Sequence, residues 1–336
     1  MPWPVCYHAL SFGPSGPHTK PRLVLPLPNA TKSDLLLVLV TLLAAAGWVF
    51  SQEAVRLMPP LLFMCLRFLI AGGLLALAGH RQLRRMSREQ LLRSLRVGLV
   101  FGLGMSCWVM GLHFGKHLGE GAFLASLAVV MVPIIARVVF GEIPPPTTWL
   151  ALPVAVGGLA LLSLNGGQFR PEAGQLFFLA AAMIFALYFT LNTRAANVQT
   201  VTTARGVMRR EKIPALGLTA VALITVGLVT GLLSLISEPW RPTLTHLHSA
   251  LLGWLLASAL IATAARFFVQ TYAQSLSSHS HGVVILVLEP IWVALFAALW
   301  FDESMSGTQL AGCGMIFLSL LINRWSAISK LLKRWL

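Results

Sequence analysis

The sequence contains little charge and very little acid. Of its 336 residues, 11% are Asp, Glu, Lys or Arg, and only eleven residues are acidic. A soluble domain carries roughly 25% charged residues, so this chain lacks the polar surface that a protein in water needs. The composition therefore excludes an ordinary soluble globular domain.

Motifs for disulfides, metals and nucleotides are also missing. The four cysteines form no CxxC pair, so neither a disulfide framework nor a zinc site is supported. The sequence has no HExxH motif and no GxxxxGK[ST] loop, so we interpret its histidine pairs as loop residues and exclude ATP as a driving force acting through this chain. We expect no metal, no cofactor and no catalytic residue.

Long apolar runs make up most of the chain. Apolar residues account for 57% of the sequence, and a helix that spans a membrane needs about 20 of them in a nearly unbroken run. Ten segments qualify as candidate spans, at about 35–54, 61–79, 95–114, 120–140, 148–165, 172–192, 214–236, 250–271, 281–300 and 307–325.

Basic residues are distributed unevenly over the loops between these ten segments. If the N-terminus is cytoplasmic, nineteen Lys and Arg residues lie on the cytoplasmic side, against four on the opposite side. This excess is the pattern that the positive-inside rule describes. We therefore attribute the formal charge of +14 to membrane topology and not to nucleic-acid binding. The expected location is the bacterial inner membrane, with both termini cytoplasmic.

The chain divides into two halves that resemble each other. We predict a disordered N-terminal arm at 1–33, a first five-helix repeat at 34–168, a second at 169–326 and a basic cytoplasmic tail at 327–336. In both halves a proline-containing helix runs into an acidic turn, as in VPIIARVVFGEIPPP and EPIWVALFAALWFDES. Because five is odd, the halves would have opposite orientations in the membrane, an arrangement that recurs in transporters. The expected fold class is an all-α integral membrane protein with ten transmembrane helices as two inverted five-helix repeats.

Three segments resemble the EamA repeat of the drug/metabolite transporter superfamily. They read GWVFSQEAVRLMPPLLFMCLRFLIAGGLLAL, QTYAQSLSSHSHGVVILVLEPIWVALFAALWFDES and QLAGCGMIFLSLLI. The most specific parts are the Arg67-Phe68 pair, the Leu-Glu-Pro that contains Glu289, and the acidic turn after it. The resemblance covers about residues 35–325 and implies a ten-helix, inverted-repeat carrier that exports amino acids or related metabolites.

Glu289, followed directly by Pro290, lies within the apolar run VVILVLEPIWVALFAALW. A charged side chain at a helix centre costs about 2.5–3.5 kcal/mol on insertion scales, so it normally faces the bundle interior or water. Proline removes a backbone hydrogen bond, and the freed carbonyl is tolerated only inside protein or at a cavity. Two interpretations stay open: a cavity carboxylate that binds an ammonium group or a proton, and a structural acid paired with an arginine or a helix end.

Arg67 lies about six residues inside the second predicted span, about 9–10 Å from its start. It could hold a substrate carboxylate by its guanidinium fork, or it could pair with Glu53 at the outer end of the first span. Arg137 and Arg266, near the cytoplasmic ends of their spans, are expected to snorkel toward water.

Aromatic and amide side chains complete the candidate site. Trp48 and Trp108 fall deep in their spans beside small residues, where they either wall a void or pack helices together. A void walled by indoles suits an amphipathic solute and, through cation–π attraction, an amine. The amides could rim a cavity or join helices by hydrogen bonds. The predicted substrate-binding residues are Trp48, Gln52, Arg67, Trp108, Tyr188, Gln270 and Glu289.

These features predict a secondary transporter that exports small amphipathic metabolites, with amino acids as the leading class, by alternating access. We expect a small-molecule substrate, a surrounding lipid bilayer, and a monomer or weak dimer. The alternative is a membrane-embedded enzyme acting on a lipid-linked substrate. Such an enzyme would need acids or histidines clustered at one face, and the eleven acids are dispersed along the chain.

Overall fold

The computed structural model describes residues 29–329 except for 142, 144–145, 163, 166–167, 170–171, 198, 203–207, 212, 241–248, 277–284, 324 and 326–327. The helices in chain order are α1 (Asn29–Val55), α2 (Pro60–Ala78), α3 (His80–Leu83), α4 (Arg88–Phe114), α5 (Leu118–Ser126), α6 (Ala128–Phe140), α7 (Pro146–Leu162), α8 (Ala173–Ala196), α9 (Ala215–Ser237), α11 (Ser249–Ala257), the π-helical η1 (Ser258–Ala265), α12 (Arg266–Leu276), the 3₁₀ turn η2 (Leu286–Leu288), α14 (Glu289–Phe301) and α15 (Gly307–Asn323). Two antiparallel hairpins pair β1 (Leu164–Asn165) with β2 (Gln168–Phe169) and β3 (Gln199–Thr202) with β4 (Met208–Glu211).

Seven helical segments of the described chain are long and apolar enough to cross a membrane: Leu35–Val55, Pro60–Ala78, Arg88–Phe114, Leu118–Phe140, Ala173–Ala196, Ala215–Ser237 and Ser249–Ala273. The remaining three predicted spans correspond to the shorter apolar helices α7, α14 and α15, of 17, 13 and 17 residues. Part of the span predicted at 281–300 lies outside the described residues. The chain is a multi-pass membrane protein.

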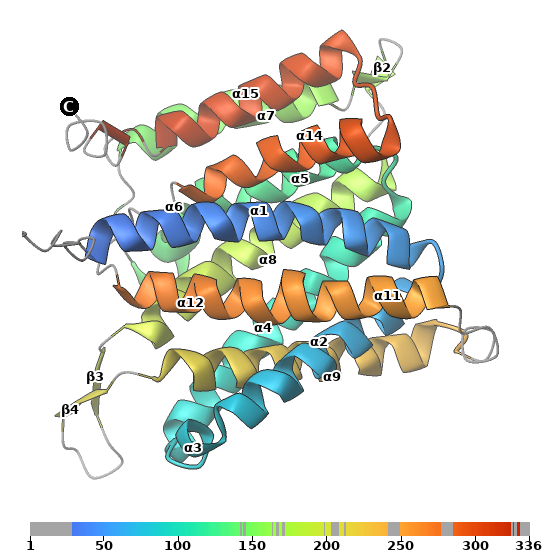
Figure 1. The fold of residues 1–336 in the computed structure, drawn as a ribbon. Helices are drawn as coiled ribbons and strands as arrows, with labels where there is room; N and C mark the ends of the chain where they lie inside the picture. Colours follow the sequence, from blue (N-terminus) through green and yellow to red (C-terminus); the bar gives the residue numbers. More distant parts are fainter. Residues whose placement is uncertain are drawn as a thin grey trace, which may run out of the picture.

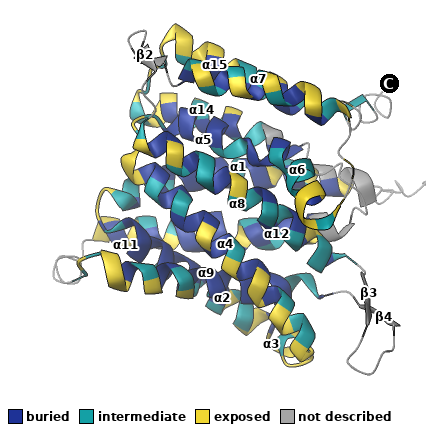
Figure 2. Ribbon diagram, turned by 180° about the vertical axis from the view of Figure 1, so that it is seen from behind, coloured by how far each residue is buried: buried dark blue, intermediate teal, exposed yellow. Residues whose placement is uncertain are grey.

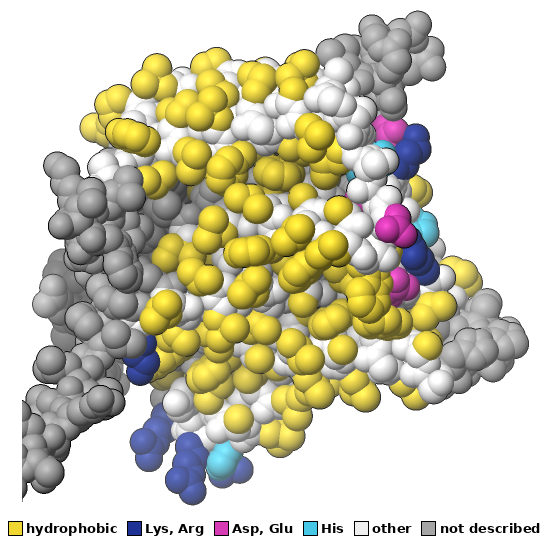
Figure 3. Space-filling view, turned by 45° about the horizontal axis from the view of Figure 1, so that its top comes forward, with side chains coloured by type: hydrophobic (Ala, Val, Ile, Leu, Met, Phe, Trp, Pro, Cys, Tyr) yellow, Lys and Arg dark blue, Asp and Glu magenta, His cyan; other side chains and the backbone are white. Residues whose placement is uncertain are grey.

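The surface fits a lipid environment. Large apolar side chains point outward along the helices, and Leu77, Val156, Leu228 and Leu299 are each at least 60% exposed. Hydrophobic side chains cover a broad belt of the molecule, whereas charged side chains gather toward its two opposite ends (Figure 3). An exposed apolar surface of this extent is what a bilayer covers.

The helices are stacked side by side (Figure 1). α2 packs on α9 at one edge of the stack and α7 on α15 at the other, with α1, α4, α5, α8, α11, α12 and α14 between them. Buried residues concentrate on the sides of the helices that face into this stack (Figure 2). The side on which α1 begins and α15 ends is called the termini face here, and the side on which α1 ends and α5 begins is called the far face.

Two glycines let α4 approach α9 closely. A Cβ atom at Gly98 would lie 2.6 Å from Cβ of Thr225, and one at Gly102 would lie 2.9 Å from Cβ of Val229. Because membrane helices associate mainly through close van der Waals packing, small residues at this contact hold the two helices together.

A proline in α6 frees a backbone carbonyl that a distant side chain then satisfies. Pro133 has no N–H, so the carbonyl of Val129 lacks its helical donor. Asn323, at the end of α15, donates from Nδ2 to this carbonyl at 3.1 Å, and its Oδ1 accepts from Thr148 Oγ1 at 2.8 Å. A carbonyl freed at membrane depth needs such a partner, so Asn323 joins α6, α7 and α15.

Two local features differ from the pattern expected from the sequence. α1 begins at Asn29, inside the segment predicted as an arm, and Ser33 is fully buried and donates to the Ala273 carbonyl at 3.0 Å. Glu289 does not lie in the middle of a regular helix; it begins α14 directly after the η2 turn. The expected break at Pro290 is therefore a change from 3₁₀ to α geometry.

Candidate functional site

A cavity lies between α1, α2, α4, α5, α6, α8, η1, α12, η2 and α14. It offers about 100 Å³ in which the centre of a water-sized molecule fits. One water needs about 10–15 Å³ by this measure, so the space is large enough for a small solute. Its aromatic lining is Trp48, Phe101, Trp108, Phe185, Tyr188, Phe189 and Phe267, and its charged lining is Arg67, Arg266 and Glu289.

The aromatic side chains that line the cavity form two groups of touching rings. The rings of Trp48 and Trp108 meet edge to face, with centroids 4.7 Å apart. Phe101 stacks on Tyr188 at 4.1 Å, and Phe267 meets Phe101 at 5.1 Å. Such pairs are worth about 0.5–1.5 kcal/mol beyond their buried area, so the rings are held in place. Together the two groups give the cavity a largely apolar wall of rings at different angles, and the Trp48 N–H in this wall donates to Glu289.

Glu289 is held by two partners at the cavity. Its Oε1 accepts a hydrogen bond from Trp48 Nε1 at 3.0 Å, and its Oε2 lies 3.3 Å from Arg266 Nη2. The side chains of Arg266 and Glu289 are 18% and 22% exposed. Glu289 thus lines the cavity and is also paired with an arginine, so each of the two open interpretations describes part of its surroundings.

The prediction that Arg266 snorkels toward water is wrong. Arg266 begins α12, which ends at Leu276, so it lies about 15 Å from that helix end at 1.5 Å per residue. From this depth its side chain turns toward Glu289 and the cavity instead of reaching the membrane surface.

Arg67 is buried, with 3% of its surface exposed, and is held by hydroxyl groups. Its Nε donates to Thr263 Oγ1 at 2.5 Å and its Nη1 donates to Ser51 Oγ at 2.7 Å. The two hydroxyls donate in turn to the carbonyls of Ser258 and Gly47. The bond from Thr263 spans five residues, the spacing of the π-helical turns in η1. An irregular helix therefore places the hydroxyl that orients Arg67.

The alternative pairing of Arg67 with Glu53 is wrong. Glu53 instead accepts a hydrogen bond from Trp300 Nε1 at 3.1 Å and lies 3.8 Å from Arg56 Nη1. Among the described residues no carboxylate lies within 4.0 Å of the Arg67 guanidinium. Arg67 points into the bundle, whereas Glu53 lies near the far face at the end of α1.

The cavity brings together six of the seven predicted substrate-binding residues: Trp48, Arg67, Trp108, Tyr188, Gln270 and Glu289. Gln52 is not among the lining residues. The sequence analysis did not single out Phe101, Met105 or Phe267. Phe101 and Met105 lie seven and three residues before Trp108 on α4, so the helical period could have identified them as neighbours on one face.

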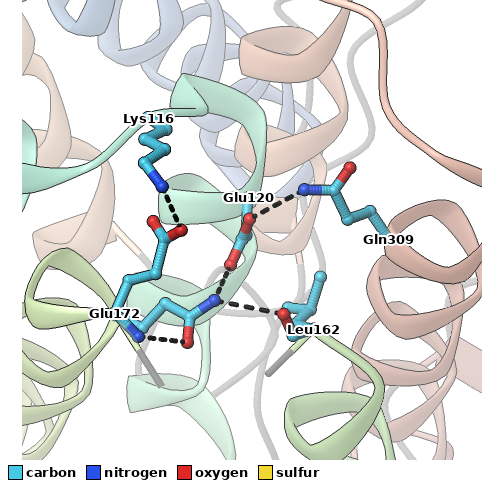
Figure 4. A network of polar contacts seen from close by, with 6 residues as sticks. Lys116, Glu120, Leu162, Glu172 and Gln309 are labelled. Carbon is cyan, nitrogen blue, oxygen red and sulfur yellow. Dashed lines mark hydrogen bonds and ion pairs between the residues drawn. The ribbon is translucent and has the colours of Figure 1, made fainter. Parts of the chain in front are cut away.

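A polar network joins several helices near the far face (Figure 4). The Gln175 amide donates to Glu120 and, at 3.2 Å, to the Leu162 carbonyl. Gln309 Nε2 donates to the other Glu120 oxygen at 3.4 Å, so the network connects α5, α8 and α15. Lys116 lies 2.7 Å from Glu172 beside it, and this hydrogen bond raises the pKa of Lys116 above its ordinary value.

Two carboxylates bind helix N-termini at the far face. Glu303, after α14, accepts from the Leu118 N–H at 3.0 Å at the start of α5. Glu238, after α9, accepts from the Leu61 and Leu62 N–H groups at 2.8 and 2.9 Å at the start of α2. An acid at a helix N-terminus satisfies free N–H groups and complements the helix dipole. Each acid therefore fastens a segment of the second half of the chain to a helix of the first.

Comparison with known proteins identifies the family. The model of the EamA-like transporter family matches residues 31–164 and 172–325. The chain belongs to the EamA-like transporter family. The resemblance inferred from the sequence is confirmed.

Relatives of this EamA-like protein include the "Uncharacterized transporter YwfM" of Bacillus subtilis, 28% identical over 298 residues that cover 84% of this chain and 92% of that protein. An "Uncharacterized transporter" of Archaeoglobus fulgidus is 22% identical over 290 residues, 86% of this chain and 85% of that protein. A solved crystal structure superimposes with a TM-score of 0.61 at 18% identity, covering 89% of this chain and 98% of that one. That likeness concerns the fold alone.

Proposed function

We propose that this EamA-like protein is a secondary transporter that exports small amphipathic metabolites, with amino acids as the leading class, by alternating access. The observation that carries the proposal is the cavity, where an aromatic wall meets Arg67 and Glu289. A carboxylate suits the guanidinium fork, and a flat apolar side chain suits the indole and phenyl rings.

The helix packing supports a ten-helix arrangement of two inverted five-helix repeats. The second half repeats the order of the first if their helices are matched in sequence. In this matching α8 corresponds to α1, α9 to α2, α11–α12 to α4, α14 to α5–α6, and α15 to α7. The contacts between α2 and α9, α5 and α14, and α7 and α15 then each join a helix to its counterpart. The contact of α4 with α8 likewise has its counterpart in that of α12 with α1. This exchange pattern is what a two-fold axis in the membrane plane produces.

Alternating access is supported by the contrast between the cavity and the far face. The bonds of Glu303 to α5, and of Glu120 to Gln175 and Gln309, join the two halves there. A state open to the far face would need these bonds to separate. The observed arrangement fits a state that is closed on that side.

The basic residues support a cytoplasmic termini face in a bacterial inner membrane. Arg81, Arg84, Arg85 and Arg88 lie in and beside α3, which lies on the same side as the start of α1 (Figure 1). Under the positive-inside rule this side faces the cytoplasm, and solute leaving through the far face would be exported.

Transport by purified protein in proteoliposomes tests the proposal. The twenty amino acids are offered singly, with and without an imposed pH gradient, and protein-free liposomes serve as the blank. Saturable movement of one group is expected, and at equal protein level it should fall for Glu289→Gln and for Trp48→Ala, which change the cavity wall. Wild-type protein that moves no amino acid above the blank would overturn the amino-acid assignment. Equal transport by Glu289→Gln would remove that carboxylate from the mechanism.

A further inference from the structure

The charges around the cavity do not balance. Its lining contains two guanidinium groups, Arg67 and Arg266, and one carboxylate, Glu289, which leaves a net charge of +1. These side chains are largely buried, so an uncompensated charge attracts an opposite charge more strongly than it would at the surface. The excess must be assigned to one of the two arginines before a ligand can be inferred.

The excess positive charge belongs to Arg67. Arg266 has Glu289 as its partner at 3.3 Å. Among the described residues, the partners of Arg67 are the hydroxyls of Thr263 and Ser51 and the rings of Phe63 and Phe68, 5.7 and 5.6 Å from the guanidinium carbon, and none of these groups carries a charge. The bonds to the hydroxyls use Nε and Nη1. The third nitrogen, Nη2, lies 3.6 Å from where a Cβ atom of Gly47 would be, and Gly47 lines the cavity. The described residues form no hydrogen bond with Nη2, so the guanidinium presents this nitrogen at the cavity wall.

Glu289 is poorly placed to bind an ammonium group. Its Oε1 is used by Trp48 and its Oε2 by Arg266, so a cation would have to displace a bond or share an oxygen. It would also bring the net charge of the lining to +2, whereas a carboxylate would bring it to zero. Electrostatics thus favours an anion despite the indole rings, which would attract a cation.

Unpartnered polar atoms mark where further solute groups would bind. Arg266 Nε and Gln270 Oε1 are buried and have no hydrogen-bond partner among the described residues. Gln270 is 2% exposed, and both side chains line the cavity from α12, four residues apart on one face. A buried polar atom without a partner is unfavourable, and a bound solute would relieve it. The Arg266 N–H suits a carboxylate oxygen, and the Gln270 carbonyl suits an O–H or N–H donor.

We propose that the solute recognised in this cavity is an aromatic carboxylate with a net charge of −1, bound through its carboxylate at Arg67, and that an ammonium group is not required. This inference rests on the proposed function and narrows its substrate class. Amino acids with aromatic side chains share the carboxylate and the ring, but their ammonium group brings their net charge to zero, so they should bind no more tightly than aromatic carboxylates that lack it.

Three solutes with one skeleton test this directly: 3-phenylpropionate, which has only the carboxylate, phenylalanine, which has both groups, and phenethylamine, which has only the amine. Binding to detergent-solubilised wild-type protein is measured by isothermal titration calorimetry, because a binding assay is unaffected by passive diffusion of the acid. We expect 3-phenylpropionate to bind at least as tightly as phenylalanine, and phenethylamine to bind at least tenfold more weakly. Preference for the amine, or binding of none of the three, would overturn the inference.

Arginine variants locate the binding group. Arg67→Gln should weaken 3-phenylpropionate binding at least tenfold, and Arg67→Lys should give an intermediate loss because it keeps the charge without the fork. Arg56→Gln, which changes an exposed arginine outside the cavity, is the matched control. If Arg67→Gln does not fold, the ranking of the three solutes on wild-type protein still decides. If the protein transports amino acids but binds phenethylamine more tightly than 3-phenylpropionate, this inference is wrong and the proposed function still holds. If it binds 3-phenylpropionate but transports no amino acid, the proposed function is wrong and this inference still holds.

Discussion

Removing Glu289 and Arg266, singly and together, tests whether they form one buried unit. Deleting one partner of a buried ion pair costs about 3–5 kcal/mol, because the other charge is left uncompensated. The side chains here are 18% and 22% exposed and 3.3 Å apart, so we reduce the expected cost of either single change to about 1–3 kcal/mol. Gln at position 289 keeps an acceptor for the Trp48 N–H, so this cost comes from the charge.

The double variant separates pairing from independent effects. In Glu289→Gln with Arg266→Gln no charge is left without its partner, so its loss of stability should be smaller than the sum of the two single losses by about 1–2 kcal/mol. Unfolding of each variant is followed by circular dichroism during titration with sodium dodecyl sulfate in mixed micelles.

A second pair on the same chain provides the control. Glu53 and Arg56 are 3.8 Å apart, and the Arg56 side chain is 55% exposed. A helix pair of this kind couples by about 0.3–0.5 kcal/mol. A coupling energy for Glu289 and Arg266 no larger than that of this exposed pair would refute the reasoning that the cavity lining depends on their mutual neutralisation.

Three further changes test the fold with the same titration. Asn323→Leu leaves the Val129 carbonyl without its donor and should lower the free energy of unfolding by about 1–2 kcal/mol. The control Thr148→Val keeps that bond and should cost about 0.6 kcal/mol, so equal losses for the two variants would contradict this account. Glu303→Gln removes the charge at the start of α5 and should cost about 0.3–1 kcal/mol, an effect that high salt should reduce. Gly98→Ala should cost about 1–3 kcal/mol by pushing α9 away, whereas Gly73→Ala, with nothing within 4 Å, should be tolerated; similar losses at both positions would argue against close α4–α9 packing.

The sequence predicted a helical, multi-pass membrane protein and the seven longer spans, because a bilayer imposes a strong, local requirement. An apolar run of about 20 residues marks a span whatever its neighbours are, and α2 and α8 begin and end close to the predicted limits. The geometry at Glu289 was harder to predict. Pro290 predicted a break in the helix. Whether the break bends a helix or begins a new one depends on the packing of α14 against α1 and α5, which no local sequence pattern encodes.

The site was predicted in its residue types but not in its pairings. Their depth in the spans, beside small residues, selected Trp48 and Trp108, and both line the cavity. The partners of Arg67 come from α1 and η1, and Thr263 lies 196 residues away in sequence. A threonine in an apolar run carries no signal that it will orient an arginine, and the π-helical turns that place it were not expected.

Arg67 and Arg266 also show how an arginine deep inside a membrane span differs from an arginine in a loop at the membrane surface. The arginines around α3 are exposed at the termini face, where water can solvate their charge. Arg67 and Arg266 lie ten or more residues, about three helical turns, from the ends of α2 and α12 at that face, so their charge must be met inside the protein. Where the protein supplies a carboxylate, as it supplies Glu289 to Arg266, the arginine charge is neutralised without a ligand. Where the described residues supply only uncharged groups, as the hydroxyls and phenyl rings around Arg67 do, the orientation is fixed but the charge is not neutralised, and the carboxylate that we propose as ligand would neutralise it.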